Sequence, residues 1–367
     1  MKKIAVLTSG RADYSIYYPI LKSLEESNRF NLHIIAFGMH LSHYHGYSID
    51  MIKKDGFKNI INIDSALSDD SEDSISISMG LTQIRMAELW KNNNYDFVLS
   101  IGDRYEMFAA VSSAIPFNIK IIHLHGGEKT LGAIDNSFRH SITAMSNIHL
   151  TSCKQHKNRV IEIIEDEERA HVYNVGSPAL DNIKSTKLFS KEIFLSEYKV
   201  DLNQPTILFT YHPETKNLNT NMRNINEIIK VFNALQENIL ITLPNNDSMG
   251  SKIRNKLVSY GQLNPKVYIF DHLGMRGYFS AMKYCSFMMG NSSSGIIEAA
   301  SLGCRVINIG QRQQGRECSE NVVHCKANKK EILKSINKIR ALGKYRNKNI
   351  YYKNNTVQRV IDIIEKY

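Results

Sequence analysis

Short apolar segments of strand length alternate along the chain with longer segments in which apolar residues recur every three to four positions. Ile16, Ile20, Leu21 and Leu24 are one example of this helical spacing. The strands predicted in the first half are 4–8, 32–37, 97–101, 120–124, 148–151 and 172–175. Strands that alternate with helices in this way predict βαβ units and a parallel sheet.

A second series of predicted strands follows Pro205 and comprises 206–211, 239–243, 267–270, 287–289 and 306–309. The polar stretch between the two series reads as a junction. We therefore predict an α/β protein with two Rossmann-like domains, 1–180 and 181–345, and an inter-domain cleft. We expect the last segment, 346–367, to form a helix that packs back on the first domain. Ligands of such sheets bind beyond the carboxyl ends of the strands, so polar motifs there are the candidate site.

Composition restricts the compartment and the partners. Hydrophobic residues make up 43% and charged residues 22% of the 367-residue chain, which predicts a sizeable core. No stretch approaches the ~18 apolar residues of a membrane span, and the apolar run 4–7 is too short for a secretory signal. The five cysteines form no C-x-x-C pair, so we expect free thiols and a cytoplasmic location. The charge of +10 is heaviest in runs at 326–330 and 344–348. No aromatic stacking pattern or nucleic-acid motif accompanies these runs, so we expect no nucleic-acid partner.

A turn made only of Gly, Asn and Ser follows the predicted strand 287–289 and opens a helix. Small residues let backbone N–H groups approach a ligand closely, and hydroxyls add donors, so Ser292, Ser293 and Gly295 predict a cradle for a phosphate or diphosphate. Glu298 lies about one helical turn further on, where a carboxylate suits a ribose diol. The alternative is an ordinary serine N-cap on a packing helix.

Two strand ends of the first domain carry candidate charges. The turn after strand 4–8 lacks G-x-G-x-x-G, which argues against a nicotinamide dinucleotide site. Arg11 in that turn suits a phosphate clamp, or alternatively pairs with Asp13. Asp103 follows Gly102 at the end of strand 97–101 and is either a catalytic carboxylate or a helix N-cap.

Imidazoles and carboxylates cluster around a Gly-Gly turn after strand 120–124. The segment contains His123, His125 and Glu128, with Asp135 a few residues later. Such groups are costly to bury unless they are paired or used. Two functions stay open for this cluster: a metal site with an H-x-H ligand pair completed by carboxylates, or metal-free acid–base catalysis.

Strand ends of the second domain supply further polar groups. His212 follows strand 206–211 and is fixed by Pro213, which suits contact with a phosphate, although a structural histidine is the alternative. Asn245 and Arg312 lie in Asn/Gly-rich loops at two later strand ends. We expect these loops to border the same rim.

Taken together, the motifs resemble the hydrolysing UDP-N-acetylglucosamine 2-epimerases of the sialic-acid and legionaminic-acid pathways. The matching motifs are S-G-R-A-D-Y at 9–14, G-M-H at 38–40, G-D-R-x-E at 102–106, H-x-H-G-G-E-K-T at 123–130, I-D-x-S-x-R-H at 134–140, G-S-P at 176–178, H-P-E-T at 212–215, P-N-N-D at 244–247, G-N-S-S-S-G at 290–295 and G-x-R-Q-x-G-R-E at 310–317. They occur in family order from one end of the chain to the other. The resemblance implies a GT-B-like pair of Rossmann domains, with UDP held mainly by the second.

The resemblance also implies a reaction and a set of site residues. A base removes the C2 proton while UDP leaves C1, and water then adds to the resulting 2-acetamidoglycal, giving a free manno-configured sugar. The substrate is UDP-N-acetylglucosamine or UDP-N,N′-diacetylbacillosamine, with no cofactor or metal, and the protein is expected to be a homodimer or homotetramer without a membrane partner. The implied catalytic residues are Asp103, Glu128, Asp135, His212 and His125. The implied substrate-binding residues are Arg11, Arg104, Asn245, His272, Ser292, Ser293, Gly295, Glu298 and Arg312.

This chain departs from many relatives at two positions of the cluster. It has His125 where they carry Glu in H-x-E-G-G-E, and Asn136 where they carry a second Asp. Which group acts as the C2 base therefore stays open. Other functions that use the same motifs are a GT-B glycosyltransferase, a non-hydrolysing epimerase, a metal-dependent hydrolase and a nucleotide-sugar sensor.

Overall fold

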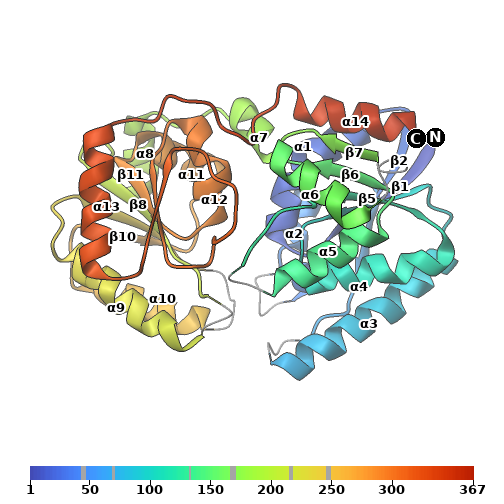
Figure 1. Ribbon diagram of the computed structural model, residues 1–367, viewed down its shortest axis with the longest axis horizontal. Coiled ribbons are helices and arrows are strands. Elements are labelled where there is room, and N and C mark those ends of the chain that lie inside the picture. Colours follow the sequence, from blue (N-terminus) through green and yellow to red (C-terminus); the bar gives the residue numbers. More distant parts are fainter. Residues whose placement is uncertain (43–46, 68–70, 132–133, 166–170, 215–217, 245–248) are drawn as a thin grey trace. The chain divides into compact units, whose positions relative to one another are not determined.

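The computed structural model describes residues 1–367 except 43–46, 68–70, 132–133, 166–170, 215–217 and 245–248. The chain forms two units (Figure 1). Unit 1 comprises Met1–Glu128, Asp135–Asp181 and Tyr351–Tyr367, and unit 2 comprises Lys129–Ile134 and Asn182–Ile350. None of the helices in the described part of the chain is long and apolar enough to cross a membrane.

Unit 1 is built on a parallel sheet of seven strands in the order β3-β2-β1-β4-β5-β6-β7. The strands are β1 (Lys2–Thr8), β2 (Phe30–Phe37), β3 (Ile60–Ile63), β4 (Phe97–Ile101), β5 (Lys120–Leu124), β6 (Ile148–Thr151) and β7 (His171–Asn174). The chain order reverses between β1 and β4, which is the switch point where such sheets bind ligands.

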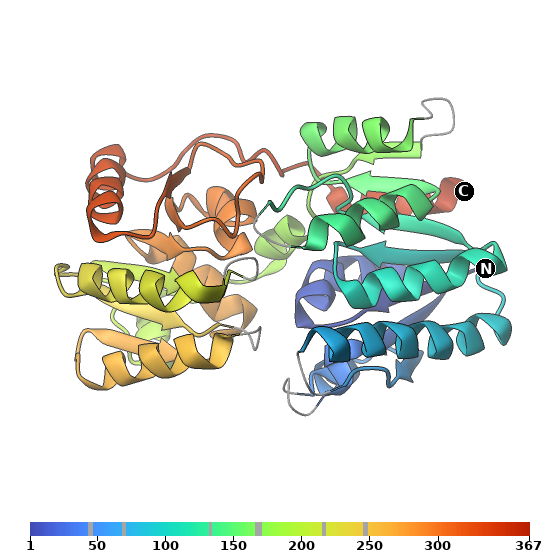
Figure 2. The same cartoon turned by 60° about the horizontal axis from the view of Figure 1, so that its bottom comes forward.

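Helices cover both faces of this sheet. They are α1 (Arg11–Glu26), α2 (Ile49–Lys54), α3 (Glu72–Lys91), α4 (Tyr105–Ala114), α5 (Asp135–Met145), α6 (Lys154–Ile164) and α14 (Thr356–Lys366), with short 3₁₀ turns η1 (Gly38–Leu41) and η3 (Ile115–Phe117). Helices α3 to α6 lie side by side in one layer (Figure 2), whereas α1 contacts α14. A right-handed crossover on each side of the switch point produces this division into two layers.

The C-terminal helix α14 belongs to unit 1. Val360, Ile361 and Ile364 are buried in the core formed by β1, β2 and α1. The ammonium group of Lys2 donates to the carbonyl oxygen of Glu365 at 2.7 Å, which ties the first strand to the last helix. The two ends of the chain therefore stabilise the same sheet.

Unit 2 contains a parallel sheet of six strands in the order β10-β9-β8-β11-β12-β13. The strands are β8 (Thr206–Thr210), β9 (Asn238–Thr242), β10 (Val267–Phe270), β11 (Phe287–Gly290), β12 (Val306–Ile309) and β13 (Val322–Cys325). The helices are α7 (Ala179–Ser185), which leads in from unit 1, then α8 (Lys191–Tyr198), α9 (Asn221–Phe232), α10 (Gly250–Gln262), α11 (Gly274–Tyr284), α12 (Ser293–Ile297) and α13 (Lys329–Leu342), with 3₁₀ turns η4 (Leu218–Thr220) and η5 (Ala299–Leu302).

Alternate residues of the central strand β8 enter two different cores. Ile207 and Phe209 pack with α9, α10 and α13, whereas Leu208 packs with α8 and α11. This follows from the two-residue period of a strand, since both faces of a parallel sheet are covered. The central strands consequently read as continuous apolar runs.

The predicted α/β class with two Rossmann-like sheets is confirmed, and each predicted strand is present within two residues at either end. Two edge strands, β3 and β13, were not predicted. Both are only half-buried and include polar residues, so they lack the apolar run that marks a central strand. The segment Lys129–Ile134 groups with unit 2, where the N–H of Leu131 donates to the carbonyl oxygen of Gln314 at 2.8 Å.

Candidate functional site

The small-residue turn of unit 2 begins where β11 approaches the end of β8. Gly290 has φ +132°, and a Cβ there would lie 1.9 Å from the carbonyl oxygen of Thr210, so only glycine fits. Asn291 follows and accepts the N–H of His212 at 2.7 Å while donating to its carbonyl oxygen at 2.8 Å. The loop that carries His212 is thereby fixed to the turn.

Ser292 is the N-cap of α12. Its Oγ accepts the N–H of Ser294 at 3.4 Å, so the N-cap interpretation is confirmed, and Ser292 and Ser293 both stay partly exposed. Gly295 is buried, its N–H donates to the carbonyl oxygen of Ser292, and a Cβ there would lie 2.9 Å from Val306. Gly295 therefore lets α12 pack closely on β12, a role that differs from the ligand contact predicted for it.

A chain of hydroxyl groups reaches the turn from within unit 2. Thr242 and Thr210, at the ends of β9 and β8, have their Oγ1 atoms 2.5 Å apart. The hydroxyl of Tyr278 lies 3.3 Å from Thr210 Oγ1 and 2.8 Å from the Oγ of Ser294, which in turn lies 2.8 Å from the Oγ of Ser292. Sequence analysis missed Tyr278, because a tyrosine on a packing helix has no distinguishing pattern.

Glu298 follows α12 directly. Its Oε2 is buried and has no hydrogen-bond partner among the described residues. Burial raises the pKa of this carboxyl to about 7, although the charge of Arg316 lowers it in part. An unused polar atom of this kind suits hydrogen bonds to a bound hydroxyl group.

The loop after β12 is fastened to the same turn. Arg312 and Gln313 both donate to the carbonyl oxygen of Asn291, at 3.1 and 2.9 Å. Glu214, two residues after His212, accepts the N–H of Gln311 at 2.8 Å. The structure thus brings the loops of His212, Ser292 and Arg312 together at the carboxyl ends of β8, β11 and β12.

Two further binding residues were predicted in unit 2. His272 is exposed in the segment between β10 and α11. Asn245 lies outside the described residues.

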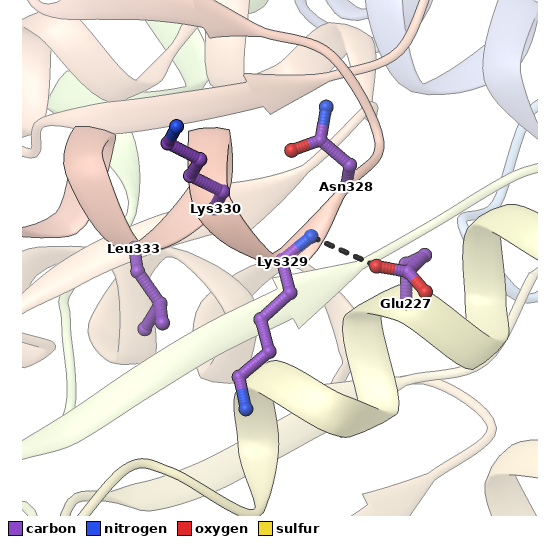
Figure 3. Close-up of a pocket in the computed structure, with 5 residues that line it drawn as sticks. All are labelled: Glu227, Asn328, Lys329, Lys330 and Leu333. Atoms are coloured by element: carbon purple, nitrogen blue, oxygen red, sulfur yellow. Dashed lines mark hydrogen bonds between the residues drawn. The ribbon is translucent and has the colours of Figure 1, made fainter.

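Unit 2 also contains cavities, one of which borders the loops that carry Glu214 and Gln311. One of about 1150 Å³ is lined by residues that follow β8, β12 and β13 and by α9. Another of about 460 Å³ lies where α13 begins beside α9, and there Glu227 accepts the N–H of Lys329 at 3.0 Å (Figure 3). Neither of these two cavities is lined by a predicted site residue.

In unit 1, Asp103 forms an ion pair with Arg139 of α5. Arg139 is 1% exposed and also donates to the carbonyl oxygen of Glu128 at 2.8 Å and to Asn136 at 2.7 Å. Helix α4 has Arg104 at its N-cap, so the prediction that Asp103 is an N-cap is wrong. One buried guanidinium therefore links Asp103 to the backbone of Glu128, a link that sequence analysis missed.

His125 forms a buried pair with Glu128. Its Nδ1 lies 3.2 Å from Oε1 of Glu128, which also accepts the hydroxyl of Ser152 at 3.4 Å. The other ring nitrogen, Nε2, is buried and has no hydrogen-bond partner among the described residues. The φ of His125 is +65°, a conformation uncommon outside glycine and typical of functional positions. The pair thus leaves one imidazole nitrogen available.

The turn that carries this pair is held tightly. A Cβ at Gly127 would lie 2.4 Å from the carbonyl oxygen of His156, and one at Gly126 would lie 2.9 Å from Nδ1 of His123. Both glycines are therefore needed for the turn to pack against its neighbours, which fixes the position of His125.

His123 does not contribute to an H-x-H metal pair. Its Nδ1 lies 3.2 Å from Oγ1 of Thr143, and its Nε2 lies 2.9 Å from the carbonyl oxygen of Gly102. Burial lowers the pKa of His123 to about 4, so the ring is neutral. Within the described ranges, no three His, Cys, Asp or Glu residues are grouped so as to hold a metal ion.

The remaining predicted residues of unit 1 are three. Arg11 is exposed at the start of α1, and Asp13 accepts the N–H and hydroxyl of Ser9 at 2.9 and 2.6 Å, so the predicted Arg11–Asp13 pair is wrong. Arg104 holds Glu106 with two hydrogen bonds of 3.1 Å. Asp135 is the first residue of α5 and is partly exposed.

Comparison with known proteins places the chain among nucleotide-sugar enzymes. Residues 22–365 match the family model described as UDP-N-acetylglucosamine 2-epimerase. The hydrolysing UDP-N,N′-diacetylbacillosamine 2-epimerase of Legionella pneumophila is 33% identical over 367 residues, covering 100% of this chain and 96% of the relative. The polysialic acid biosynthesis protein P7 of Escherichia coli is 34% identical over 373 residues, covering 100% and 94%.

Solved structures of similar proteins share the fold. The UDP-GlcNAc 2-epimerase of Neisseria meningitidis, solved with UDP-GlcNAc, superposes with a TM-score of 0.84 at 15% identity and full coverage of both chains. The Methanocaldococcus jannaschii enzyme gives a TM-score of 0.80 at 18% identity, again with full coverage of both. The match to the family model spans nearly the whole chain, and the chain belongs to the UDP-N-acetylglucosamine 2-epimerase family.

Proposed function

We propose that the protein is a hydrolysing 2-epimerase that converts a UDP-2-acetamido sugar and water into UDP and the free manno-configured sugar. The observation that carries the proposal is the His125–Glu128 pair, which has a buried, available nitrogen on a rigid turn. Removing the weakly acidic C2 proton requires a positioned base of this kind. Relatives named as hydrolysing 2-epimerases support the same reading.

The proton-transfer groups come from unit 1. His125 takes the C2 proton through Nε2, and Glu128 orients the ring and stabilises the imidazolium that forms. The C1–oxygen bond to UDP breaks at the same time, which leaves a 2-acetamidoglycal. Water then adds to C1 and a proton returns to C2 on the opposite face. Asp103 and Asp135 are the carboxylates proposed for these later transfers.

The leaving UDP is held by loops at the strand ends of unit 2. The hydroxyls of Ser292 and Ser293, with His212 and Arg312, bind the diphosphate, and the available carboxyl of Glu298 binds the ribose. Arg11 and Arg104 of unit 1 are further candidates for charge contacts with the substrate. Hydrogen bonds to the developing charge of a leaving diphosphate lower the barrier to its departure. His272 and Asn245 complete the proposed nucleotide contacts.

The substrate carries either a hydroxyl or an acetamido group at C4. Both UDP-N-acetylglucosamine and UDP-N,N′-diacetylbacillosamine present the same diphosphate and C2 centre, and relatives are named for diacetylbacillosamine and for polysialic acid synthesis. We propose that the product enters the biosynthesis of sialic-acid-like or legionaminic-acid-like sugars in the cytoplasm.

A homo-oligomer, a dimer or a tetramer, is part of the proposal and finds support on α3. Ile77 and Ile84 are 51% and 61% exposed, whereas Ser78 and Thr82 of the same helix are buried. This reverses the usual amphipathic pattern. Gly80 lies between the isoleucines, and a Cβ there would meet no atom within 4 Å, so a second helix has room to approach.

Two copies of α3 in antiparallel contact across Gly80 would place Ile77 of one against Ile84 of the other. Such an interface is isologous, because the same face of each copy contacts the other. The exposed isoleucines on either side of Gly80 therefore make the shape of this helix self-complementary.

A product assay tests the function. The purified protein is incubated with each UDP-sugar without any acceptor, and UDP and the free sugar are quantified by chromatography and mass spectrometry. We expect equimolar UDP and free sugar, with one oxygen from ¹⁸O-labelled water in the sugar. UDP release only on addition of an acceptor, or recovery of the sugar still attached to UDP, would contradict the proposal.

A further inference from the structure

Five hydroxyl groups of unit 2 form one continuous hydrogen-bonded chain that ends at the small-residue turn. From its inner end the chain runs through Thr242, Thr210, Tyr278, Ser294 and Ser292, with successive oxygens 2.5, 3.3, 2.8 and 2.8 Å apart. Thr210 and Thr242 are buried, whereas the two serines are partly exposed. The phenol of Tyr278 is the link between the sheet and the turn.

The row of five hydroxyls has one more proton than it needs for its internal hydrogen bonds. Five hydroxyls carry five protons, and the four contacts between them use four, so one proton is left at one end of the chain. If every group donates toward the turn, the spare proton lies on Ser292. The Oγ of Ser292 already accepts the N–H of Ser294, which favours using its own proton as a donor. Burial raises the pKa of Tyr278, so the phenol stays protonated and able to donate.

An anion at the turn favours this direction of donation. Hydrogen bonds in a chain polarise one another, so a negative charge beside Ser292 strengthens each bond behind it when all of them point the same way. The phenol is the middle member of the chain. Without it, Ser294 keeps only Ser292 as a hydroxyl partner, and the serine hydroxyls are no longer oriented by the sheet.

We propose that Tyr278 is a positioning residue that, through Ser294, orients the hydroxyl of Ser292 to donate to the diphosphate of UDP. The inference rests on the proposed function, because it assigns the diphosphate to this turn. It concerns the charged part of the nucleotide alone, so it predicts a selective loss of diphosphate recognition while binding of the nucleoside is kept.

The test compares the affinities of UDP and uridine for wild type and Tyr278→Phe by calorimetry and competition. The phenylalanine keeps the ring and removes only the hydroxyl. We expect UDP affinity to fall roughly three- to tenfold, the contribution of about one hydrogen bond, with uridine affinity unchanged. The KM for the UDP-sugar should rise more than kcat falls. The matched control Tyr284→Phe, on the same helix but outside the chain, should behave as wild type.

A second pair of variants keeps the test independent of packing at Tyr278. In the row of hydroxyls, Thr242 bonds Thr210 and neither serine. Thr242→Val should nevertheless weaken UDP binding, because it removes the first hydroxyl of the row. Thr242→Ser keeps that hydroxyl and should bind UDP as the wild type does. Equal UDP affinity in wild type and Tyr278→Phe, or equal losses for UDP and uridine, would overturn the proposal. A wild-type protein that binds no UDP would instead overturn the proposed function itself.

Discussion

Replacing His125 by asparagine, beside a parallel Glu128→Gln variant, separates the roles of the two residues. Asparagine tolerates the left-handed φ of +65° better than other non-glycine residues, so His125→Asn should preserve the turn. Glutamine at 128 keeps an oxygen within reach of Nδ1, 3.2 Å away in the native pair, and removes only the charge. Both variants are therefore close to isosteric with the native side chains.

The expected magnitudes differ between the two variants. His125→Asn removes the group that transfers the proton, which should lower kcat by roughly 10²- to 10⁴-fold. Glu128→Gln replaces a charge-assisted hydrogen bond by a neutral one, a loss of about 1–1.5 kcal/mol, or about tenfold in kcat. UDP affinity should be unchanged in both, because the groups proposed to bind UDP are other residues.

Steady-state kinetics with the UDP-sugar and calorimetry with UDP provide the measurements. A larger loss of kcat in Glu128→Gln than in His125→Asn would refute the reasoning and make Glu128 itself the base. Circular dichroism and melting temperatures of the two variants verify that the turn has survived the substitutions.

Three further predictions follow from the same contacts. Replacing Ser292 and Ser293 together by alanine should weaken UDP binding by about 1–3 kcal/mol, since donors to a charged group are lost; an unchanged calorimetric affinity would argue against the cradle. The pKa of Glu298 is raised to about 7 in the folded state, so the folded protein holds a proton that the unfolded chain releases above the ordinary pKa of 4.5. The free energy of unfolding should therefore fall by on the order of 3 kcal/mol as the pH rises from 4.5 through 7. Glu298→Gln should flatten this loss in denaturant titrations at pH 5 and 8. Ile84→Glu should dissociate the oligomer in light scattering, whereas the control Ile193→Glu on the exposed face of α8 should not; an unaltered mass for Ile84→Glu would remove α3 from the interface.

Much of the fold is predictable from the sequence, because the central strands are buried on both faces and their apolar runs have no other explanation. The edge strands β3 and β13 were not predicted, because half-exposed strands of four residues mix polar and apolar positions as loops do. The small-residue turn was also predictable, since its function depends on consecutive residues and on the absence of side chains.

Contacts between residues distant in sequence were not predictable. The sequence suggested His123 as a metal ligand, but both of its ring nitrogens lie within hydrogen-bond distance of Thr143 and Gly102, which only the packing of β4, β5 and α5 brings near. The contacts of Arg139 and Tyr278 were overlooked for the same reason. Each acts through partners on other elements, although Arg139 itself lies in the motif at 134–140.

The most direct test of the central claim, that the protein breaks and remakes the C2–hydrogen bond while releasing UDP, is the reaction run in deuterated water. The released sugar is analysed at C2 by proton NMR and mass spectrometry. The account predicts one solvent deuteron at C2 in every product molecule, together with inverted configuration at that carbon. A product that keeps its original hydrogen at C2 would show that no proton was abstracted and would contradict the account.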